Sequence, residues 1–223
     1  MEYIEDQIFF YVHGIKLEIV IIRLSIKDPI LCISDLQESP ELNMLIWNKA
    51  LDIIKNYSDI SECTLIMAGD FYGESFLKDE KRVEVRGKSG TVDYNLYSIN
   101  QKPKFIVYGN HDIPPNNFIK NNYLKLDNGT TITGADFIES KHYPNFLNDV
   151  EKSLKNYADI FVTHETPKLS TLWGNSNLTK LIKKYRPKIH IFGHCHLPNS
   201  IYVENNIIFI NCDSRFVLIL PST

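Results

Sequence analysis

The sequence predicts an α/β protein, a layered β-sandwich of two mixed sheets flanked by helices with an N-terminal β-hairpin extension. Two observations support this prediction. Short apolar runs alternate with amphipathic helical segments through the middle of the chain, and β-type runs joined by turns stand at both ends. We therefore expect residues 1–223 to form a single domain, with the hairpin extension at 1–28 and a motif-bearing core at 29–212.

The composition is that of an ordinary globular protein. The chain has 223 residues, 43% hydrophobic and 23% charged, which is enough for one substantial core. A net charge of -3 provides no general basic field, so there is no strong nucleic-acid signal, and a nucleotide would have to be bound locally. The four cysteines have no CxxC spacing and are expected to be reduced.

No targeting or membrane-spanning segment is predicted. The first six residues are acidic where a signal peptide is basic, and the apolar run at 15–24 is interrupted by Lys16, Glu18 and Arg23. We therefore expect a cytoplasmic protein without membrane contact. The oligomeric state is left open.

Five short apolar runs each end in a residue type that binds metals. Such runs read as buried strands, and the turn residues after them are costly to desolvate unless something binds them. The runs are 29–33, 64–68, 104–108, 159–162 and 188–192, and the polar residues that follow them include Asp35, Asp70, Asn110, His164 and His194. Any one of these could be an ordinary turn, but the recurrence favours a site.

Helices are predicted between these strands. Ser39, Pro40 and Glu41 have the pattern of a helix start, and apolar residues then recur every three or four positions up to Tyr57. Further helices are expected at about 144–157 and 178–185, with a short helical segment at 92–99.

The remaining segments are expected to be short strands and turns. A hairpin should turn near Gly14, and short strands should lie near 131–133 and 137–138 after a turn at 127–129. The tail, 200–220, is expected to form a meander with a hairpin turn at Asn205–Asn206.

Three histidines are expected to have no ligand role. His13 is predicted to be a turn residue, His142 a surface residue and His190 a hydrogen-bonded core residue. The segment 86–90 is more ambiguous. Arg86 and Lys88 could bind a phosphate of the substrate, but a plain surface loop is the alternative.

His194 and His196 can enter one site if their segment is extended, because alternate residues of a strand share a face. With the residues after the other strands, they offer more nitrogen and oxygen ligands than one tetrahedral ion needs. Two divalent cations fit this set better. Such a pair clamps the attacking and leaving oxygens in phosphoryl transfer and supplies a hydroxide near neutral pH.

These residues resemble the five motifs of the calcineurin-like metallophosphoesterases. The matching segments are Asp35-Leu36-Gln37, Gly69-Asp70, Gly109-Asn110-His111-Asp112, His164 and Gly193-His194-Cys195-His196. The resemblance spans about residues 29–212 and implies a two-sheet sandwich with two divalent metals. Manganese is the expected metal, with iron, zinc, nickel or cobalt as alternatives.

The resemblance also implies a role for each residue. Asp35 and His196 would bind the first metal and Asp70 would bridge the two. Asn110, His164 and His194 would bind the second. His111 would act on the phosphate and the leaving group as a catalytic residue, oriented by Asp112.

Two residues depart from the family pattern. The first motif is usually Asp-x-His, but Gln37 occupies the histidine position and would be a neutral, poorer ligand. Gly73 stands where the second motif usually has another aspartate. Both changes affect the first metal site.

Three functions compete at this stage. The leading prediction is a metal-dependent phosphohydrolase that cleaves a phosphodiester or phosphomonoester of a small molecule or nucleotide by a two-metal-activated hydroxide. The alternative is a binding or scaffold protein with a weakened metal site and little activity. A nuclease lacks support because the sequence shows no basic groove.

Overall fold

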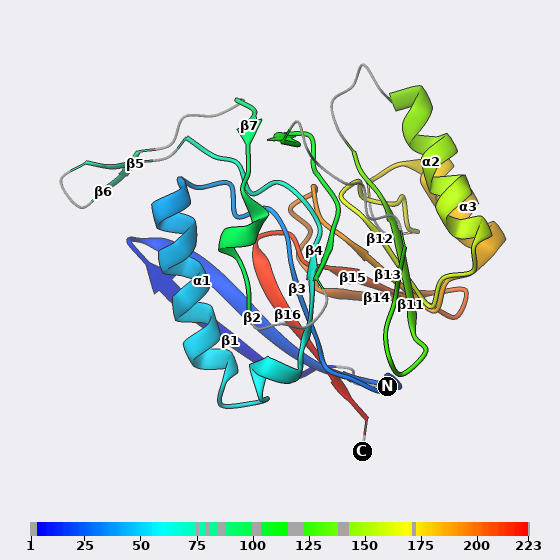
Figure 1. Cartoon of the computed structure of the whole chain (residues 1–223), viewed down its shortest axis with the longest axis horizontal. Helices are drawn as coiled ribbons and strands as arrows, with labels where there is room; N and C mark the ends of the chain where they lie inside the picture. The colour runs from blue at the N-terminus through cyan, green and yellow to red at the C-terminus, as the bar shows by residue number, and fades with distance from the viewer. Residues whose placement is uncertain are drawn as a thin grey trace.

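The protein is built of four layers (Figure 1). The computed structural model describes residues 4–74, 76–78, 81–83, 88–99, 104–115, 123–137, 143–170 and 173–222. Two six-stranded sheets pack face to face, helix α1 (Pro40–Ile54) covers one, and helices α2 (Tyr143–Lys155) and α3 (Ser176–Tyr185) cover the other. The predicted fold class is confirmed.

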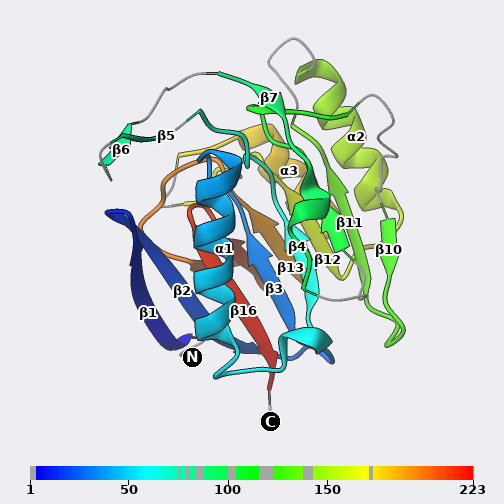
Figure 2. The same cartoon turned by 60° about the vertical axis from the view of Figure 1, so that its left-hand side comes forward.

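The first sheet contains both ends of the chain. Its strands, in spatial order, are β1 (Ile4–Val12), β2 (Ile15–Leu24), β16 (Arg215–Pro221), β3 (Ile30–Ile33), β4 (Thr64–Met67) and β8 (Lys104–Ile106). Strand β16 is parallel to β2 and antiparallel to β3. The N-terminal hairpin is thus an edge of this sheet, joined to the rest through the last strand of the chain (Figure 2).

The second sheet is formed by the later part of the chain. Its strands, in spatial order, are β10 (Tyr123–Lys125), β11 (Thr131–Ala135), β12 (Ile160–Thr163), β13 (Ile189–Phe192), β15 (Ile207–Asn211) and β14 (Ile201–Glu204). Strands β11, β12, β13 and β15 are parallel to their neighbours in this run. Their carboxyl ends therefore lie at one edge of the sheet.

Short elements fill the loops. Strand β7 (Gly90–Thr91) pairs with β9 (Asp112–Ile113), and β5 (Phe76–Lys78) pairs with β6 (Lys81–Val83). Two 3-10 turns, η1 (Ile60–Glu62) and η2 (Tyr94–Leu96), complete the described part. The helical segment expected at 92–99 is this single turn, η2.

The strands alternate their side chains between two cores. In β3, Ile30 and Cys32 enter the core between the sheets, whereas Leu31 and Ile33 face the core beneath α1. Helix α1 begins as predicted, with the Ser39 hydroxyl accepting a hydrogen bond from the Leu42 amide at 3.3 Å. A third core lies between the second sheet and helices α2 and α3.

The predicted tail meander is wrong in its last strand. The hairpin β14–β15 forms, with Asn205 and Asn206 at φ 53° and 63° as a type I′ turn requires. Strand β16 then leaves this sheet and enters the other one, between β2 and β3. Its side chains alternate between the core under α1, as Phe216 does, and the core between the sheets, as Val217 does. Burial of both faces therefore stabilises the strand at this position.

His190 is a core residue, as predicted. Its imidazole is fully buried against Phe161, Phe192 and Phe209, and its Nε2 atom lies 2.9 Å from the hydroxyl of Thr163. Burial lowers the pKa of His190 to about 3. His142 lies outside the described residues.

This histidine should make the fold sensitive to acid. In the unfolded chain the His190 side chain binds a proton near pH 6.5. Protonation therefore lowers the free energy of unfolding as the pH falls from 6.5 towards 3, by up to about 1.4 kcal/mol per pH unit. The substitution His190→Phe should remove this component. Urea unfolding at pH 7 and pH 4.5, both in chelator, measures it, and equal pH slopes for the two proteins would contradict the assignment.

Candidate metal centre

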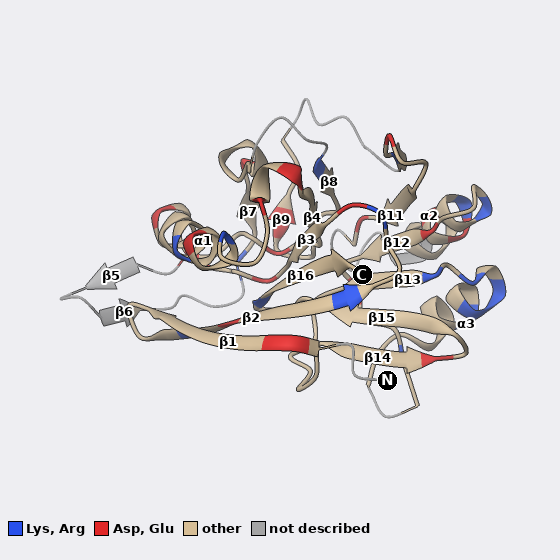
Figure 3. Cartoon of the chain, turned by 90° about the horizontal axis from the view of Figure 1, so that it is seen from below, with Lys and Arg blue, Asp and Glu red and all other residues tan. Residues whose placement is uncertain are grey.

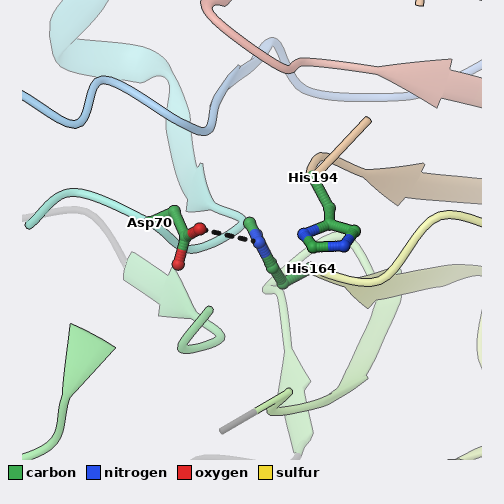
Figure 4. A group of neighbouring side chains, drawn as sticks. All are labelled: Asp70, His164 and His194. Atoms are coloured by element: carbon green, nitrogen blue, oxygen red, sulfur yellow. Dashed lines mark ion pairs between the residues drawn. The ribbon is translucent and has the colours of Figure 1, made fainter. Parts of the chain in front are cut away.

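The carboxyl ends of strands from both sheets meet at one place. Asp70 follows β4 of the first sheet, and His164 and His194 follow β12 and β13 of the second. One ligand atom from each of these three residues lies within 4.8 Å of the others, and the rings of the two histidines are 5.1 Å apart (Figure 4). The site is therefore a junction between the two sheets.

His164 is at the centre of this junction. Its Nδ1 atom lies 2.8 Å from the carbonyl oxygen of Ala68, which can only accept, so Nδ1 carries a hydrogen. Its Nε2 atom lies 3.1 Å from an oxygen of Asp70, 3.2 Å from the side-chain oxygen of Asn110 and 4.0 Å from Asp35. Three other predicted ligands thus lie around one nitrogen of His164.

The two carboxylates are deeply buried. Asp35 is 5% exposed and Asp70 is fully buried. One oxygen of Asp35 accepts hydrogen bonds from the Ser34 hydroxyl and, at 3.0 Å, from the backbone amide of His194. One oxygen of Asp70 accepts from the backbone amide of His111 at 2.8 Å.

Burial and charge shift the proton affinities of these groups. Burial raises the pKa of Asp35 well above its usual range, and Asp213 and Asp70 add to this rise against the opposing effect of His164. Burial opposes protonation of His164, but the carboxylates of Asp70 and Asp35 outweigh it and raise the pKa of His164 to about 10. Burial lowers the pKa of His194 to about 4. The centre accordingly favours a positive charge at the position faced by the Nε2 atom of His164.

The backbone of the site is strained. Asp35, Gln37, Asp70 and His194 have φ values of 57°, 45°, 57° and 73°, a region that side chains other than glycine, asparagine and aspartate seldom adopt. Such conformations persist only where surrounding contacts enforce them, and they gather at functional sites. The sharp bends place each side chain directly at the strand end.

Gln37 reaches the centre from the first motif. Its amide nitrogen donates a hydrogen bond to Asp70 at 3.0 Å, so the side chain lies beside the carboxylate expected to bridge the metals. Gly73 explains the second departure from the family pattern. A Cβ atom there would lie 1.9 Å from the carbonyl oxygen of Gln37, so no aspartate fits without moving this loop.

His196 lies apart from the three-residue cluster. Its side chain is 79% exposed, and its Nδ1 atom pairs with the buried carboxylate of Asp213 at 2.9 Å. It lines the same cleft as Asp35 and Gln37, on the side expected to hold the first metal. A carboxylate on one imidazole nitrogen is the usual support for a histidine that binds a metal through the other.

The predicted role of Asp112 is corrected. It was expected to orient His111, but its two oxygens accept hydrogen bonds from the backbone amides of Asp70, Phe71, Tyr72 and Gly109 and from the hydroxyl of Tyr94. These amides surround a buried carboxylate and occupy its hydrogen-bond acceptor positions. Asp112 therefore fixes the loop that carries Asp70 relative to the loop that carries His111.

His111 is oriented by Lys88 instead. The Nδ1 atom of His111 lies 3.0 Å from the carbonyl oxygen of Lys88, in the segment that pairs with β9. The Lys88 amine, predicted to bind phosphate, forms an ion pair with Glu74 at 2.5 Å. Arg86, the other residue of that prediction, lies outside the described residues.

Two contributors to the site were not recognised in the sequence. Asp213 follows β15, so it repeats the pattern of a buried strand that ends in an acidic residue, and that signal was available. The carbonyl group of Lys88 could not be recognised in the sequence, because every residue has a backbone carbonyl whatever its side chain.

A known protein family matches this sequence. The sequence profile of the calcineurin-like phosphoesterases matches residues 28–198. The chain belongs to this family. It is also 26% identical over 214 residues to the UPF0046 protein K07C11.7 of Caenorhabditis elegans, an alignment that covers 78% of this chain and 70% of that protein.

Solved structures share the fold of this phosphoesterase. The phosphopantetheinyl hydrolase PptH of Mycobacterium tuberculosis has a TM-score of 0.53 at 14% identity, with 85% of this chain and 90% of that one covered. The Plasmodium protein GAP50 has a TM-score of 0.51 at 18% identity, with coverage of 84% and 72%. At these identities the likeness concerns the fold alone.

Members of this family bind divalent metals, and the residues present suit such ions. Two buried carboxylates, an amide oxygen and imidazole nitrogens face one space, and neighbouring carboxylates raise each other's cost of ionisation unless a cation offsets it.

The basic residues coloured in Figure 3 occur on both helix layers. None of the described helices combines the length and apolarity that a membrane crossing needs.

Removing the metal should destabilise this phosphoesterase. We expect the protein loaded with manganese to melt at a lower temperature after chelation, because Asp35 and Asp70 then lose the cation that offsets their burial. His164→Ala should lose bound metal and most of this shift, whereas Lys49→Ala, on the exposed side of α1, should keep both. Elemental analysis and thermal melts measure the two effects, and an unchanged melt together with no bound metal would contradict a metal centre.

Proposed function

We propose that this protein hydrolyses a phosphodiester or phosphomonoester of a small molecule or nucleotide with two divalent cations. The observation that carries the proposal is the convergence of Asp70, His164, His194 and Asn110 at the junction of the two sheets, with Asp35 and Gln37 beside them. Manganese is our proposed metal, with iron, zinc, nickel or cobalt as alternatives. A cytoplasmic location stays a prediction from the sequence.

The ligands divide into two groups. Asn110, His164 and His194 would hold one cation, Asp35 and His196 the other, and Asp70 would contact both. The cations, when bound, would neutralise the phosphate oxygens and supply a hydroxide near neutral pH. The carbonyl of Ala68 keeps the Nε2 atom of His164 directed at the centre.

His111 is our candidate for proton transfer. Its Nδ1 atom donates to the Lys88 carbonyl, so its Nε2 atom is the nitrogen available to the substrate. The backbone amide of His111 also holds Asp70, so the imidazole is attached directly to the loop that binds metal. Protonated at Nε2, it would give its proton to the leaving oxygen as the ester bond breaks.

The competing function is a binding protein that keeps the fold with little activity. The His111 imidazole favours the catalyst. It is held by one nitrogen on a residue whose amide binds Asp70, and a binding protein does not need a proton donor there. A screen of aryl phosphomonoesters and phosphodiesters with added manganese separates the two functions. No release of aryl alcohol from any of them would favour the binding protein.

His111→Ala should lower turnover by roughly 100-fold to 10,000-fold, the usual range for a general acid or base. Metal content should stay close to that of the wild type, because the imidazole is not among the proposed ligands. Turnover and elemental analysis are measured on the same preparation. A parallel loss of metal and activity would make His111 a ligand.

The site of Gln37 should bind its cation less tightly than the other site. A neutral carboxamide replaces an imidazole there, so activity should saturate only at high manganese while one equivalent survives dialysis. Gln37→His should tighten this site by roughly 10-fold to 100-fold. Manganese titration of both proteins measures this, and two tightly held equivalents in the wild type would show that the glutamine suffices.

A further inference from the structure

A cleft of about 450 Å³ lies between the tip of the N-terminal hairpin and the first-motif loop. Its lining includes His13 and Lys16 from the hairpin and Asp35, Gln37, His196 and Ser214 from the metal side. The hairpin strands β1 and β2 end before residue 28, where the family match begins. This wall of the cleft is therefore contributed by a part of the chain that the family pattern does not include.

Lys16 is the cation that this wall offers to a ligand. Its side chain is exposed, and its amine lies 4.0 Å from the centre of the Phe9 ring. Among the described residues the Lys16 amine forms no ion pair with a carboxylate, and it lies over the Phe9 ring instead. An ammonium group at the rim of a cleft, without an acidic partner, is suited to an anion.

The other charged groups nearby are already engaged. A second cleft of about 290 Å³ adjoins the first, because both are lined by Lys16, His196 and Ser214, and it extends to Arg215. The Arg215 guanidinium pairs with Glu18 at 3.2 Å and donates to Ser200 and to the Leu197 carbonyl. Four acidic residues line the two clefts. Asp213 is held by His196, Glu18 by Arg215, and Asp35 by the Ser34 hydroxyl and the His194 amide, whereas Glu38 is buried.

His13 supplies a second donor at the same rim. It has φ 45°, at a turn position where asparagine, aspartate or glycine is usual, and its neighbour Gly14 has φ 82°. The chain therefore keeps an imidazole where backbone preference favours a smaller residue.

We infer that the hairpin tip binds a second phosphate group of the substrate, through Lys16 and His13. The scissile phosphate would lie at the metal centre, and the rest of the substrate would extend through the cleft past Gln37. The preferred substrate class is thus a phosphate ester that carries another phosphate. This inference rests on the proposed hydrolase function.

Two substrates that differ only in the second phosphate test it. Butyl phosphate and 1,4-butanediol bisphosphate have the same alkyl ester bond, and phosphate release measures both. We expect a kcat/KM roughly 10-fold to 100-fold higher for the bisphosphate, the range of one or two hydrogen bonds to a charged group. Equal values for the two substrates would overturn the inference and leave the hydrolase function intact. Hydrolysis of neither would overturn the inference, and the screen of aryl phosphomonoesters and phosphodiesters then decides the hydrolase function separately.

Variants locate the effect. Lys16→Ala should raise KM for the bisphosphate roughly 10-fold to 100-fold with little change in kcat, so that the preference between the two substrates falls, and Lys16→Arg should restore much of it. Lys49→Ala, which removes an exposed lysine from α1, should keep the wild-type preference. A fall of the same size for both substrates in Lys16→Ala would indicate a structural role and overturn the inference.

His13→Asn separates recognition from backbone strain, because asparagine tolerates a positive φ. We expect it to keep or raise the melting temperature and to lower the preference for the bisphosphate. Calorimetric binding of 1,4-butanediol bisphosphate to His111→Ala protein, with and without Lys16→Ala, gives a readout that does not depend on turnover. Equal affinities in that pair of proteins would also overturn the inference.

Discussion

The central constraint on this structure is the burial of two carboxylates, Asp35 and Asp70, where two sheets meet. Ionised groups in such a place need positive charge and hydrogen-bond donors within reach. The protein provides backbone amides from His194 and His111 and the imidazole of His164. Negative charge that these donors do not offset is the reason that the junction suits metal ions.

The same constraint explains the surrounding loops. A side chain can point straight at the junction only if the chain turns sharply as the strand ends, and the left-handed backbone at Asp35, Asp70 and His194 achieves this. Aspartate tolerates this conformation, and contacts between loops help to hold it at all three positions. Asp112 is the principal example, since its single carboxylate ties together amides from two motif loops. Asp112, a residue with a structural role, thus fixes the geometry of the site.

The strand ends and the convergence of most candidate ligands could be predicted because their signals are local. An apolar run followed by a glycine or a polar residue identifies both a buried strand and the residue presented at its end, as at Asp70 and His164. The route of Phe216–Leu220 into the first sheet could not be predicted, because pairing between distant strands leaves no trace in either strand alone. The acceptor for His111 was missed for a similar reason, since the carbonyl of Lys88 is set by the β7–β9 pairing.

The position of β16 sets an order on the assembly of the protein. Strand β2 has β1 on one side and β16 on the other, so the hairpin can join the first sheet only after residues 215–221 are in place. During synthesis the loops of the candidate metal centre, at 35, 70, 110, 164 and 194, all emerge before this strand does. The long sequence separation between β2 and β16 makes their closure a late and slow step. The wall of the cleft that carries Lys16 and His13 is accordingly the last part of this cleft to form, after the residues of the candidate metal centre have left the ribosome.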